Sequence, residues 1–359
     1  MSRTYRVIQW GTGNVGLQSL RSLIRHPKLE LVGLHANAEA KQGKDAGELA
    51  GLDVVTGVKA TNDVDALMAL EPDCCVYMAN GELRAKDATD DMARLLRAGI
   101  DVVGVALIQF IYPAHGDPNL RGALEEACRA GGSTLFINGI DPGFSGDVLP
   151  LAALQIAGEV EEIRVQEICD YSTYEDPDFT GVAFGFGKDE SASPIMGMPG
   201  MLTSGWGAMV RLMADALGVE LEEIREVYER DFAKEAFECP MMRVEAGECG
   251  AVRFELQGIV DGKPFIVTEH VNRLGLYQAP HWPKAPEGRS GVHRAIVKGN
   301  PDVQLECFTK GEDGDHNTGG VQATANRVIN AIPQVVGMNA GMVSTLDLPW
   351  TPSGNLATG

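Results

Sequence analysis

Three glycines near the start of the chain have the spacing of a dinucleotide-binding turn. They lie in a run that follows the apolar stretch 6–10 and opens the amphipathic stretch 14–25. The run, which we assign to cofactor binding, reads Gly11, Thr12, Gly13, Asn14, Val15, Gly16. In such turns the first glycine permits a tight bend, the second lets the backbone approach a diphosphate, and the third allows close helix–strand packing. The sequence therefore predicts a nucleotide site here, with an empty glycine turn as the alternative.

The residues after the second predicted strand, 29–34, indicate which nicotinamide cofactor is bound. Enzymes that use NAD usually place Asp or Glu there, about 20 residues beyond the glycines, to bind the ribose hydroxyls. No carboxylate follows the strand directly in this chain, and Asn37 and Lys41 stand in that region. Asn37 can bond a ribose hydroxyl or a 2′-phosphate, and Lys41 or His35 can neutralise such a phosphate. We therefore predict NADP, while Glu39 keeps NAD possible.

Candidate proton donors and substrate-binding residues lie in the second half of the chain. Hydride transfer to C=O or C=N needs a group that supplies a proton or stabilises charge on the substrate oxygen or nitrogen. Tyr171, Tyr174 and His270 stand at or near the ends of predicted strands and are our candidates, with a structural role on a sheet face as the alternative. Arg164 and Arg273 can bind a substrate carboxylate, but pairing with nearby acids is the favoured interpretation.

A stretch rich in methionine and tryptophan lies between these candidates. Its members recur at helical spacing: Met196, Met198, Met201, Trp206, Met209, Met213. This spacing favours core packing, and the alternative is the lid of an apolar substrate pocket. His281 and His293 have no ligand spacing with a cysteine pair, so we predict no metal. The seven cysteines are scattered without a C-x-x-C motif, which is typical of buried thiols in a reducing cytosol.

The alternation of strand and helix patterns predicts the fold of the first part of the chain. Short apolar runs alternate with amphipathic stretches, which is typical of a parallel sheet covered by helices on both faces, the doubly wound α/β fold of Rossmann domains. The predicted strands are 6–10, 29–34, 73–78, 101–107 and 134–138. The predicted helices are 14–25, 63–70, 87–98 and 120–130.

After Pro142 the pattern changes to that of an α+β domain with an open, largely antiparallel sheet. Strands are predicted at 163–171, 252–259, 265–274 and 295–307, the middle two joined by the hairpin signal Asp261-Gly262-Lys263. Helices are predicted at 197–217, 221–232 and 323–332, the last ending before Pro333. We therefore divide the chain into a dinucleotide-binding domain at 1–145, a substrate domain at 146–320, and a segment at 321–359 that returns to the first domain.

Composition and charge exclude several classes of function. Hydrophobic residues make up 44% and charged residues 22%, the balance of a globular protein with a large core. The 30 Lys and Arg face 50 Asp and Glu, and the net charge of -20 argues against nucleic acid or an anionic membrane as a partner. The sequence shows no apolar leader and no apolar stretch of about 18 residues. We expect a cytoplasmic protein that acts on a small molecule.

Three further motifs carry a family resemblance. They read Gly43-Lys44-Asp45-Ala46-Gly47-Glu48-Leu49-Ala50-Gly51, Asn138-Gly139-Ile140-Asp141-Pro142-Gly143-Phe144 and Asn330-Ala331-Ile332-Pro333. With the glycine turn they resemble the dihydrodipicolinate reductase N-terminal-like superfamily, and within it the group of 2,4-diaminopentanoate dehydrogenase and native amine dehydrogenases. Dihydrodipicolinate reductase itself matches poorly, because its His-His and Lys catalytic motif is absent here.

The resemblance implies a homodimer, a cofactor at the carboxyl edge of the sheet, and hydride transfer to an imine or iminium carbon. It also implies that the turn 138–144 lies near the nicotinamide. We accordingly assign these further residues to cofactor binding: Ala79, Asn80, Asn138, Pro142, Gly143, Asn330.

One position departs from the amine dehydrogenases that the chain resembles. Those enzymes carry a catalytic Glu just upstream of a Tyr-Pro pair, which is Tyr112-Pro113 here. The matching position holds Ile108 or Gln109, and neither side chain can act as a base. Gln109 can still orient a substrate by hydrogen bonds, so we keep it as a candidate.

Three functions stay open at this point. The favoured one is an NAD(P)H-dependent oxidoreductase that transfers hydride to C=N of a small substrate, as an amine dehydrogenase or imine reductase does. The second is a carbonyl reductase or another dehydrogenase on the same scaffold, and the missing Glu adds weight to it. The third is a non-catalytic nucleotide-binding protein. The effect of ammonia on ketone-dependent NADPH oxidation separates the first two.

Overall fold

The computed structural model describes residues 3–174 and 176–350. The chain divides into two compact units, unit 1 with Met1–Ile140 and Val321–Gly359 and unit 2 with Asp141–Gly320. Within the described residues, none of the helices is both long enough and apolar enough to cross a membrane.

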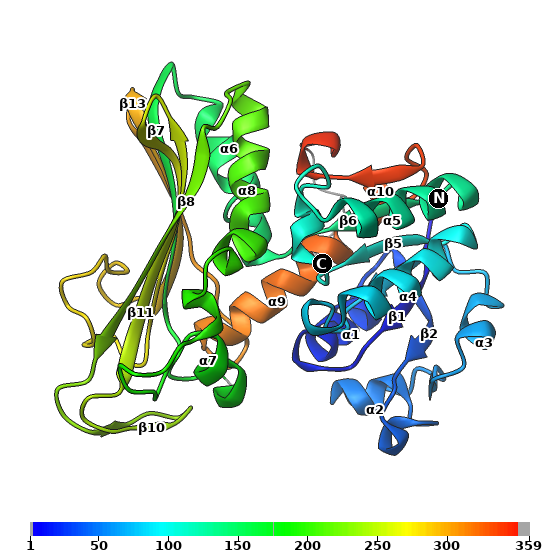
Figure 1. Cartoon of the computed structure of the whole chain (residues 1–359). Helices are drawn as coiled ribbons and strands as arrows, with labels where there is room; N and C mark the ends of the chain where they lie inside the picture. The colour runs from blue at the N-terminus through cyan, green and yellow to red at the C-terminus, as the bar shows by residue number, and fades with distance from the viewer. Residues whose placement is uncertain (1–2, 175, 351–359) are drawn as a thin grey trace. The chain divides into compact units, whose positions relative to one another are not determined.

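The described strands of unit 1 form one parallel sheet of seven strands in the order β15-β6-β5-β4-β1-β2-β3 (Figure 1). They are β1 (Tyr5–Trp10), β2 (Leu29–His35), β3 (Ala60–Thr61), β4 (Cys74–Tyr77), β5 (Asp101–Gly104), β6 (Thr134–Ile137) and β15 (Gly341–Val343). The strand order reverses between β1 and β4, which is where doubly wound folds bind dinucleotides. The predicted Rossmann fold is confirmed.

Helices and short helical turns connect these strands. The helices are α1 (Asn14–Arg25), α2 (Ala46–Ala50), α3 (Val64–Met68), α4 (Ala85–Arg97), α5 (Pro118–Gly131), α9 (His316–Ile329) and α10 (Ile332–Val335). The 3₁₀ turns are η1 (Glu39–Lys41), η2 (Glu82–Arg84), η3 (Ile108–Ile111) and η6 (Thr345–Asp347). A core beside the sheet joins Leu23 of α1 and Val328 of α9 to Val7 and Val76 of the central strands. The C-terminal segment adds β15 in parallel to β6, a strand that the sequence pattern did not reveal.

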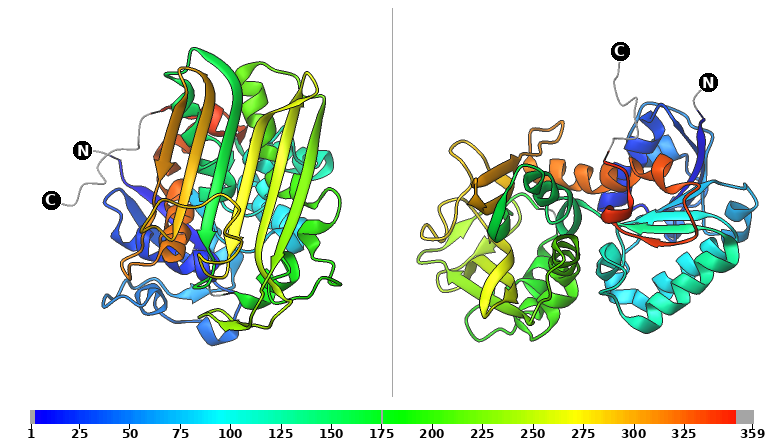
Figure 2. Two further views of the ribbon diagram at one scale, coloured as in Figure 1. Left: turned by 90° about the vertical axis from the view of Figure 1, so that its left-hand side faces the viewer. Right: turned by 90° about the horizontal axis from the view of Figure 1, so that it is seen from above.

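Unit 2 contains a six-stranded mixed sheet in the order β14-β13-β7-β12-β11-β8, counted over the described residues. The strands are β7 (Glu159–Asp170), β8 (Glu223–Phe232), β11 (Cys249–Val260), β12 (Lys263–Arg273), β13 (Gly291–Asn300) and β14 (Val303–Cys307), with a separate short pair, β9 (Phe237–Glu238) and β10 (Arg243–Val244). Only the β7–β12 pair of this sheet is parallel, so the predicted open, largely antiparallel sheet is confirmed. Figure 2 (left) shows its strands side by side.

The helices of unit 2 are α6 (Val148–Leu154), α7 (Pro177–Ala183) and α8 (Met201–Leu217), with a short helical turn at η5 (Ile195–Gly197). The turn η4 (Ile140–Phe144) starts at the last residue of unit 1, and its middle residues have non-helical backbone angles. Helices α6 and α8 pack against the sheet, α6 on β13 and β14 and α8 on β8, β11 and β12 (Figure 1). Trp206, Met209 and Met213 of α8 are buried, whereas Met198 and Met201 at its start are exposed. Core packing therefore accounts for the second half of the methionine- and tryptophan-rich stretch.

The helix predicted at 221–232 is wrong, because this segment forms β8, an edge strand paired with β11 along its length. Its alternating Glu and Arg residues have helix-like composition. Cross-strand pairing overrides that preference, as it often does in half-buried strands. Glu229 of β8 forms an ion pair of 2.7 Å with Arg253 of β11.

Two further boundaries differ from the predictions. The strand predicted at 295–307 is a hairpin, β13 and β14, whose turn is held by the Gly299 N–H donating to Asp302 Oδ1 at 2.8 Å. The helix predicted to end before Pro333 ends at Ile329, and a new helix, α10, takes Pro333 into its first turn. Proline is tolerated there because the first N–H groups of a helix have no partner within the helix.

Candidate functional site

The glycine turn of unit 1 is shaped by two close backbone approaches. Gly11 has a φ of +100°, and a Cβ built on it would lie 3.0 Å from the Ala79 nitrogen at the end of β4. A Cβ on Gly16 would lie 2.6 Å from the Gly11 oxygen. Any side chain at either position would push the helix away from the sheet, so both glycines are required by packing.

The start of α1 is open, and this opening fits an anion. Gly13 is exposed, and a Cβ built on it would meet no atom within 4 Å. Gly13 is also the N-cap of α1, and no side chain accepts a hydrogen bond from the first turn. The free N–H groups and the helix dipole favour a negative charge at this point. A diphosphate therefore fits the space next to Gly13.

Lys41 places a positive charge beside the same turn. Its Nζ donates to the Thr12 carbonyl oxygen at 2.8 Å and to Thr12 Oγ1 at 2.9 Å. Asn37, after β2, is exposed. His35 is buried and stacked on Trp10 at 3.8 Å between ring centroids, and burial lowers the pKa of His35 to about 4. His35 is therefore neutral at neutral pH and unsuited to bind a phosphate, which leaves Lys41 and Asn37 for that role.

The other residues assigned to the cofactor have different surroundings. Asn80 follows β4, is exposed, and its Oδ1 accepts from the Glu82 N–H at 3.1 Å. Asn138 is buried after β6, and its Nδ2 donates to Thr345 Oγ1 at 3.3 Å. Asn330 is half-buried beyond the end of α9. Pro142 and Gly143 belong to unit 2, where the Gly143 N–H donates to the sulfur of Met209 at 3.2 Å.

A carboxylate from another segment, that of Glu82, lies beside the segment 108–113, which lacks the expected Glu. The amide oxygen of Gln109 accepts from the Asp117 N–H at 2.7 Å, so this side chain holds the loop before α5. The Ile108 N–H donates to Glu82 Oε1 at 3.0 Å. Burial raises the pKa of Glu82, a residue that the sequence analysis missed. Its position just after the strand-ending Asn80 was the signal that could have revealed it.

Unit 2 contains a row of four directly paired side chains on four neighbouring strands. Strand register places Phe254 of β11 opposite His270 of β12, His270 opposite Glu167 of β7, and Glu167 opposite His293 of β13. All four residues are buried. From this row the sequence analysis proposed a role for His270 alone and considered His293 only as a metal ligand, because register between strands cannot be read from one sequence.

His270 carries a positive charge between two carboxylates. Its Nε2 lies 3.2 Å from Asp141 Oδ1 and its Nδ1 lies 3.5 Å from Glu167 Oε1. Burial alone lowers the pKa of His270, but the charges of Asp141 and Glu167 outweigh it and raise the pKa to about 10. The ring is stacked on Phe254 at 4.4 Å and meets the edge of Trp206 at 4.9 Å. The imidazole is thus fixed in place and protonated at neutral pH.

Glu167 is held as a carboxylate by donors on one of its oxygens. Tyr171 Oη and Asn272 Nδ2 each donate to Glu167 Oε1 at 2.8 Å. Burial alone raises the pKa of Glu167, but the His270 charge and, to a smaller extent, the Asn272 donor lower this pKa overall. Burial raises the pKa of Tyr171, whose ring stacks on Tyr174 at 5.2 Å. The Tyr171 hydroxyl proton therefore stabilises Glu167.

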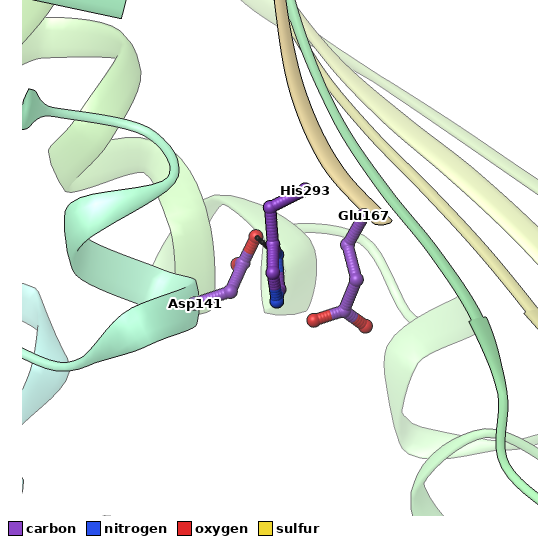
Figure 3. Close-up of side chains that lie close together, drawn as sticks. All are labelled: Asp141, Glu167 and His293. Carbon is purple, nitrogen blue, oxygen red and sulfur yellow. Dashed lines mark ion pairs between the residues drawn. The ribbon is translucent and has the colours of Figure 1, made fainter. Parts of the chain in front are cut away.

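Asp141 completes the group that we call the buried polar cluster: Asp141, Glu167, His270 and His293. Ser145 Oγ donates to Asp141 Oδ2 at 2.6 Å, and Trp206 Nε1 donates to Asp141 Oδ1 at 2.8 Å. His293 Nδ1 lies 3.9 Å from Asp141 Oδ2. Figure 3 shows Asp141, Glu167 and His293 gathered around one point, and one ligand atom from each lies within 4.8 Å of the others. This arrangement can hold a cation, and the absence of a metal stays a prediction.

The two arginines proposed for a substrate carboxylate are engaged in structural contacts. Arg164 Nη1 lies 2.7 Å from Glu255 Oε1 and 2.8 Å from Glu269 Oε2. Arg273 is buried and donates to the backbone carbonyls of Gln278, Ala279 and Pro283. The favoured interpretation, pairing with acids, is confirmed for Arg164. It is wrong for Arg273, which holds a loop through backbone carbonyls.

The Rossmann sheet with its open glycine turn, together with a second unit that buries ionisable groups on a mixed sheet, defines a dehydrogenase-type oxidoreductase. Residues 144–355 match the 2,4-diaminopentanoate dehydrogenase C-terminal domain. The chain belongs to the 2,4-diaminopentanoate dehydrogenase family.

Relatives agree with this assignment. An amine dehydrogenase of Streptomyces virginiae is 40% identical over 347 residues, which cover 96% of each chain. A 2,4-diaminopentanoate dehydrogenase of Acetoanaerobium sticklandii is 21% identical over 267 residues, 74% of this chain and 70% of that protein. The solved structure of an amine dehydrogenase from Mycobacterium smegmatis covers 96% of both chains with a TM-score of 0.74 at 19% identity. A dipicolinate-bound dihydrodipicolinate reductase from Paenisporosarcina sp. TG-14 shares the fold with a TM-score of 0.50 at 12% identity, covering 96% of this chain and 98% of that one. The predicted family resemblance is confirmed.

Proposed function

We propose that this protein is an NAD(P)H-dependent amine dehydrogenase, which transfers hydride between a nicotinamide and the carbon of a C=N bond in a small substrate. The observation that carries the choice of C=N is the pair of buried carboxylates, Asp141 and Glu167, in the buried polar cluster. The sequence alone left imine and carbonyl reduction open, and these carboxylates favour imine reduction.

The residues of unit 1 fit a nicotinamide dinucleotide. Its diphosphate would bind the open N–H groups at Gly13, and Lys41 and Asn37 stand where the adenosine ribose of such cofactors binds. Lys41 favours NADP, since it can pair with a 2′-phosphate. Ala79 and Asn80 at the end of β4, and Asn138 and Asn330, remain proposed cofactor contacts. A bound nicotinamide supplies or accepts the hydride.

The proposed reaction balances as follows. A carbonyl compound, ammonia and a proton give an iminium ion and water. The iminium carbon then gains the hydride from NAD(P)H, and the C=N π electrons become the lone pair of the neutral amine. The charge on the substrate nitrogen falls from one to zero in this step, whereas reduction of a ketone would place negative charge on oxygen.

The buried polar cluster suits the cationic iminium that accepts the hydride and opposes the alkoxide that reduction of a ketone would form. Two carboxylates, Asp141 and Glu167, flank the protonated His270, so these three side chains together carry one net negative charge. In the described part of the chain, no Lys or Arg forms an ion pair with Asp141 or Glu167. A buried negative charge stabilises a cationic iminium and raises the energy of a developing alkoxide, because Coulomb interactions are strong away from water.

A spectrophotometric assay tests this proposal. The absorbance of NADPH and of NADH is followed with a panel of small ketones and aldehydes, with and without ammonium, and the amine product is identified. We expect oxidation that requires ammonium and gives a primary amine. Oxidation indifferent to ammonium, with an alcohol as product, would show a carbonyl reductase. Cofactor binding without turnover on any compound would show a nucleotide-binding protein.

The quaternary structure belongs to the same proposal. We propose a homodimer in the cytoplasm, as the family resemblance implies. Light scattering coupled to size-exclusion chromatography measures the mass directly, and a mass near the 38.4 kDa of one chain would refute the dimer.

A further inference from the structure

We infer that the buried polar cluster binds the positively charged nitrogen of the substrate, as ammonium or as the iminium formed from it. The inference rests on the proposed function and names the residues that hold the nitrogen. This chain lacks the Glu expected next to Tyr112-Pro113, and we assign the binding role to residues of unit 2.

One buried nitrogen of the cluster, His293 Nδ1, lacks a hydrogen-bond partner among the described residues. Asn272 Oδ1, on the side chain that donates to Glu167, lacks one as well. His293 and Asn272 are 5% and 0% exposed, so bulk water does not satisfy these atoms. Leaving a buried polar atom unsatisfied is costly, and such atoms in a folded protein usually mark a bound ligand or ordered water. Two such atoms next to the carboxylates indicate a polar ligand that enters from outside the chain.

The spacing of the cluster fits a nitrogen cation. Oxygen atoms of Asp141 and Glu167 and a nitrogen of His293 all lie within 4.8 Å of one another. A nitrogen atom at their centre would lie within about 2.8 Å of each, which is the length of a charge-assisted N–H···O or N–H···N hydrogen bond. Ammonium offers enough N–H donors for all three acceptors. The primary iminium R₂C=NH₂⁺ offers two donors and directs its carbon out of the cluster.

A divalent metal ion fits the same atoms less well. The carboxylates already accept hydrogen bonds from neutral donors, Asp141 from Ser145 and Trp206, and Glu167 from Tyr171. The charge left after His270 is one, which a monovalent cation neutralises and a divalent ion overcompensates. The protonated imidazole within 3.5 Å of both carboxylates repels any cation bound to them, and it repels a divalent ion about twice as strongly as a monovalent one.

The walls of the cluster indicate what the substrate carries besides nitrogen. Phe254 and Trp206 lie 4.9 Å apart between ring centroids, and both rings touch His270. Such aromatic rings exclude water and attract cations. The chemistry favours a small apolar group on the carbon that bears the nitrogen.

The test compares Glu167→Gln with a matched control. Glu269→Gln removes a buried carboxylate on the same strand as His270, but the Glu269 side chain pairs with Arg164 and Arg253 and does not contact the cluster. His293→Phe is a second cluster variant, which removes the free Nδ1 and keeps the ring. For each protein we measure the KM for ammonium at saturating carbonyl substrate, the Kd for NADPH, and the melting temperature with and without methylammonium.

We expect the KM for ammonium to rise at least tenfold in Glu167→Gln and in His293→Phe, with an unchanged Kd for NADPH. The KM should stay within twofold of the unsubstituted protein in Glu269→Gln. Methylammonium should raise the melting temperature of the unsubstituted protein and of Glu269→Gln only. An unchanged KM in the folded cluster variants would overturn the inference and leave the proposed function standing. Stoichiometric Co²⁺ binding that is lost in Glu167→Gln, without a methylammonium effect, would overturn it as well.

The melting experiment separates the inference from the proposed function. If the protein turns over no substrate with ammonium, the proposed function fails. A methylammonium effect that depends on Glu167 would then still support a cation site. If turnover requires ammonium but neither cluster variant changes the KM or the melting response, the inference fails alone.

Discussion

The substitution Gly13→Asp should stabilise the fold slightly and weaken cofactor binding strongly. Gly13 is the N-cap of α1 and has φ and ψ of -77° and -166°, an extended conformation that aspartate adopts without strain. No atom lies within 4 Å of its missing Cβ, so the new side chain has room. Its carboxylate would accept the free N–H groups of the first turn, which the cofactor diphosphate otherwise uses.

Both magnitudes follow from this geometry. Aspartate is a better N-cap than glycine by a few tenths of a kcal/mol, which corresponds to about 1 °C in melting temperature for a unit of this size. In the complex, the carboxylate and the diphosphate would lie about 4 Å apart, which costs about 4 kcal/mol at an effective dielectric constant of about 20. At about 1.4 kcal/mol per factor of ten, the cofactor affinity should fall by about a thousandfold.

Calorimetric titration with NADPH and NADH and thermal melting of the apoprotein measure the two effects. Gly122→Asp is the matched control, because Gly122 is exposed in α5 and its missing Cβ also meets no atom within 4 Å. We expect no change of affinity in that control. If Gly13→Asp binds both cofactors with unchanged affinity, the diphosphate does not lie at the start of α1, and the assignment of the nucleotide site is refuted.

Three further predictions concern packing, cofactor choice and pH. Gly16→Ala should lower the free energy of unfolding by about 1–3 kcal/mol, since its Cβ would lie 2.6 Å from a backbone oxygen; a denaturant titration with an unchanged midpoint would contradict this close packing. Lys41→Ala should weaken NADPH about tenfold and leave NADH nearly unchanged, because an exposed charge-assisted bond to phosphate is worth about 1.5 kcal/mol; equal losses for both cofactors would show that Lys41 does not face a 2′-phosphate. The pKa of His270 is raised, so its charge stabilises the fold fully below pH 6.5, and this stabilisation is lost as the pH rises through about 10. The pKa of Glu167 is lowered, so its charge stabilises the fold above pH 4.5, and this stabilisation is lost in acid below that value. Melting temperatures across this range should therefore fall at both ends, and His270→Gln, if folded, should lose the alkaline part of the dependence; an unaltered alkaline fall in that variant would contradict the charged state of His270.

The fold was largely predictable because its signals are local. The apolar run before Gly11 and the amphipathic stretch after it predicted β1 and α1, and the turn Asp261-Gly262-Lys263 predicted the β11–β12 hairpin. β8 was misread as a helix, because its charged residues suit a helix and the partner strand that overrides this preference lies about 20 residues further on. β15 is three residues long and carries too short a pattern to detect.

The candidate site was predictable in unit 1 and largely hidden in unit 2. The glycine turn is contiguous in sequence, so its spacing carried the assignment. The polar cluster draws single residues from β7, β12 and β13 and from the turn at Asp141, and its geometry depends on strand register. His270 was visible as an ionisable residue near a strand end. Glu167 was one polar residue in an alternating strand, which is indistinguishable in sequence from a solvent-facing one.

Tracing the hydride tests the central claim most directly. NAD(P)H deuterated at the transferable position is incubated with the protein, a ketone that it accepts, and ammonium, and the products are analysed by mass spectrometry. Hydride transfer to C=N predicts a primary amine with one deuterium on the carbon that bears nitrogen, and no product when ammonium is left out. A deuterated alcohol formed without ammonium would contradict the account.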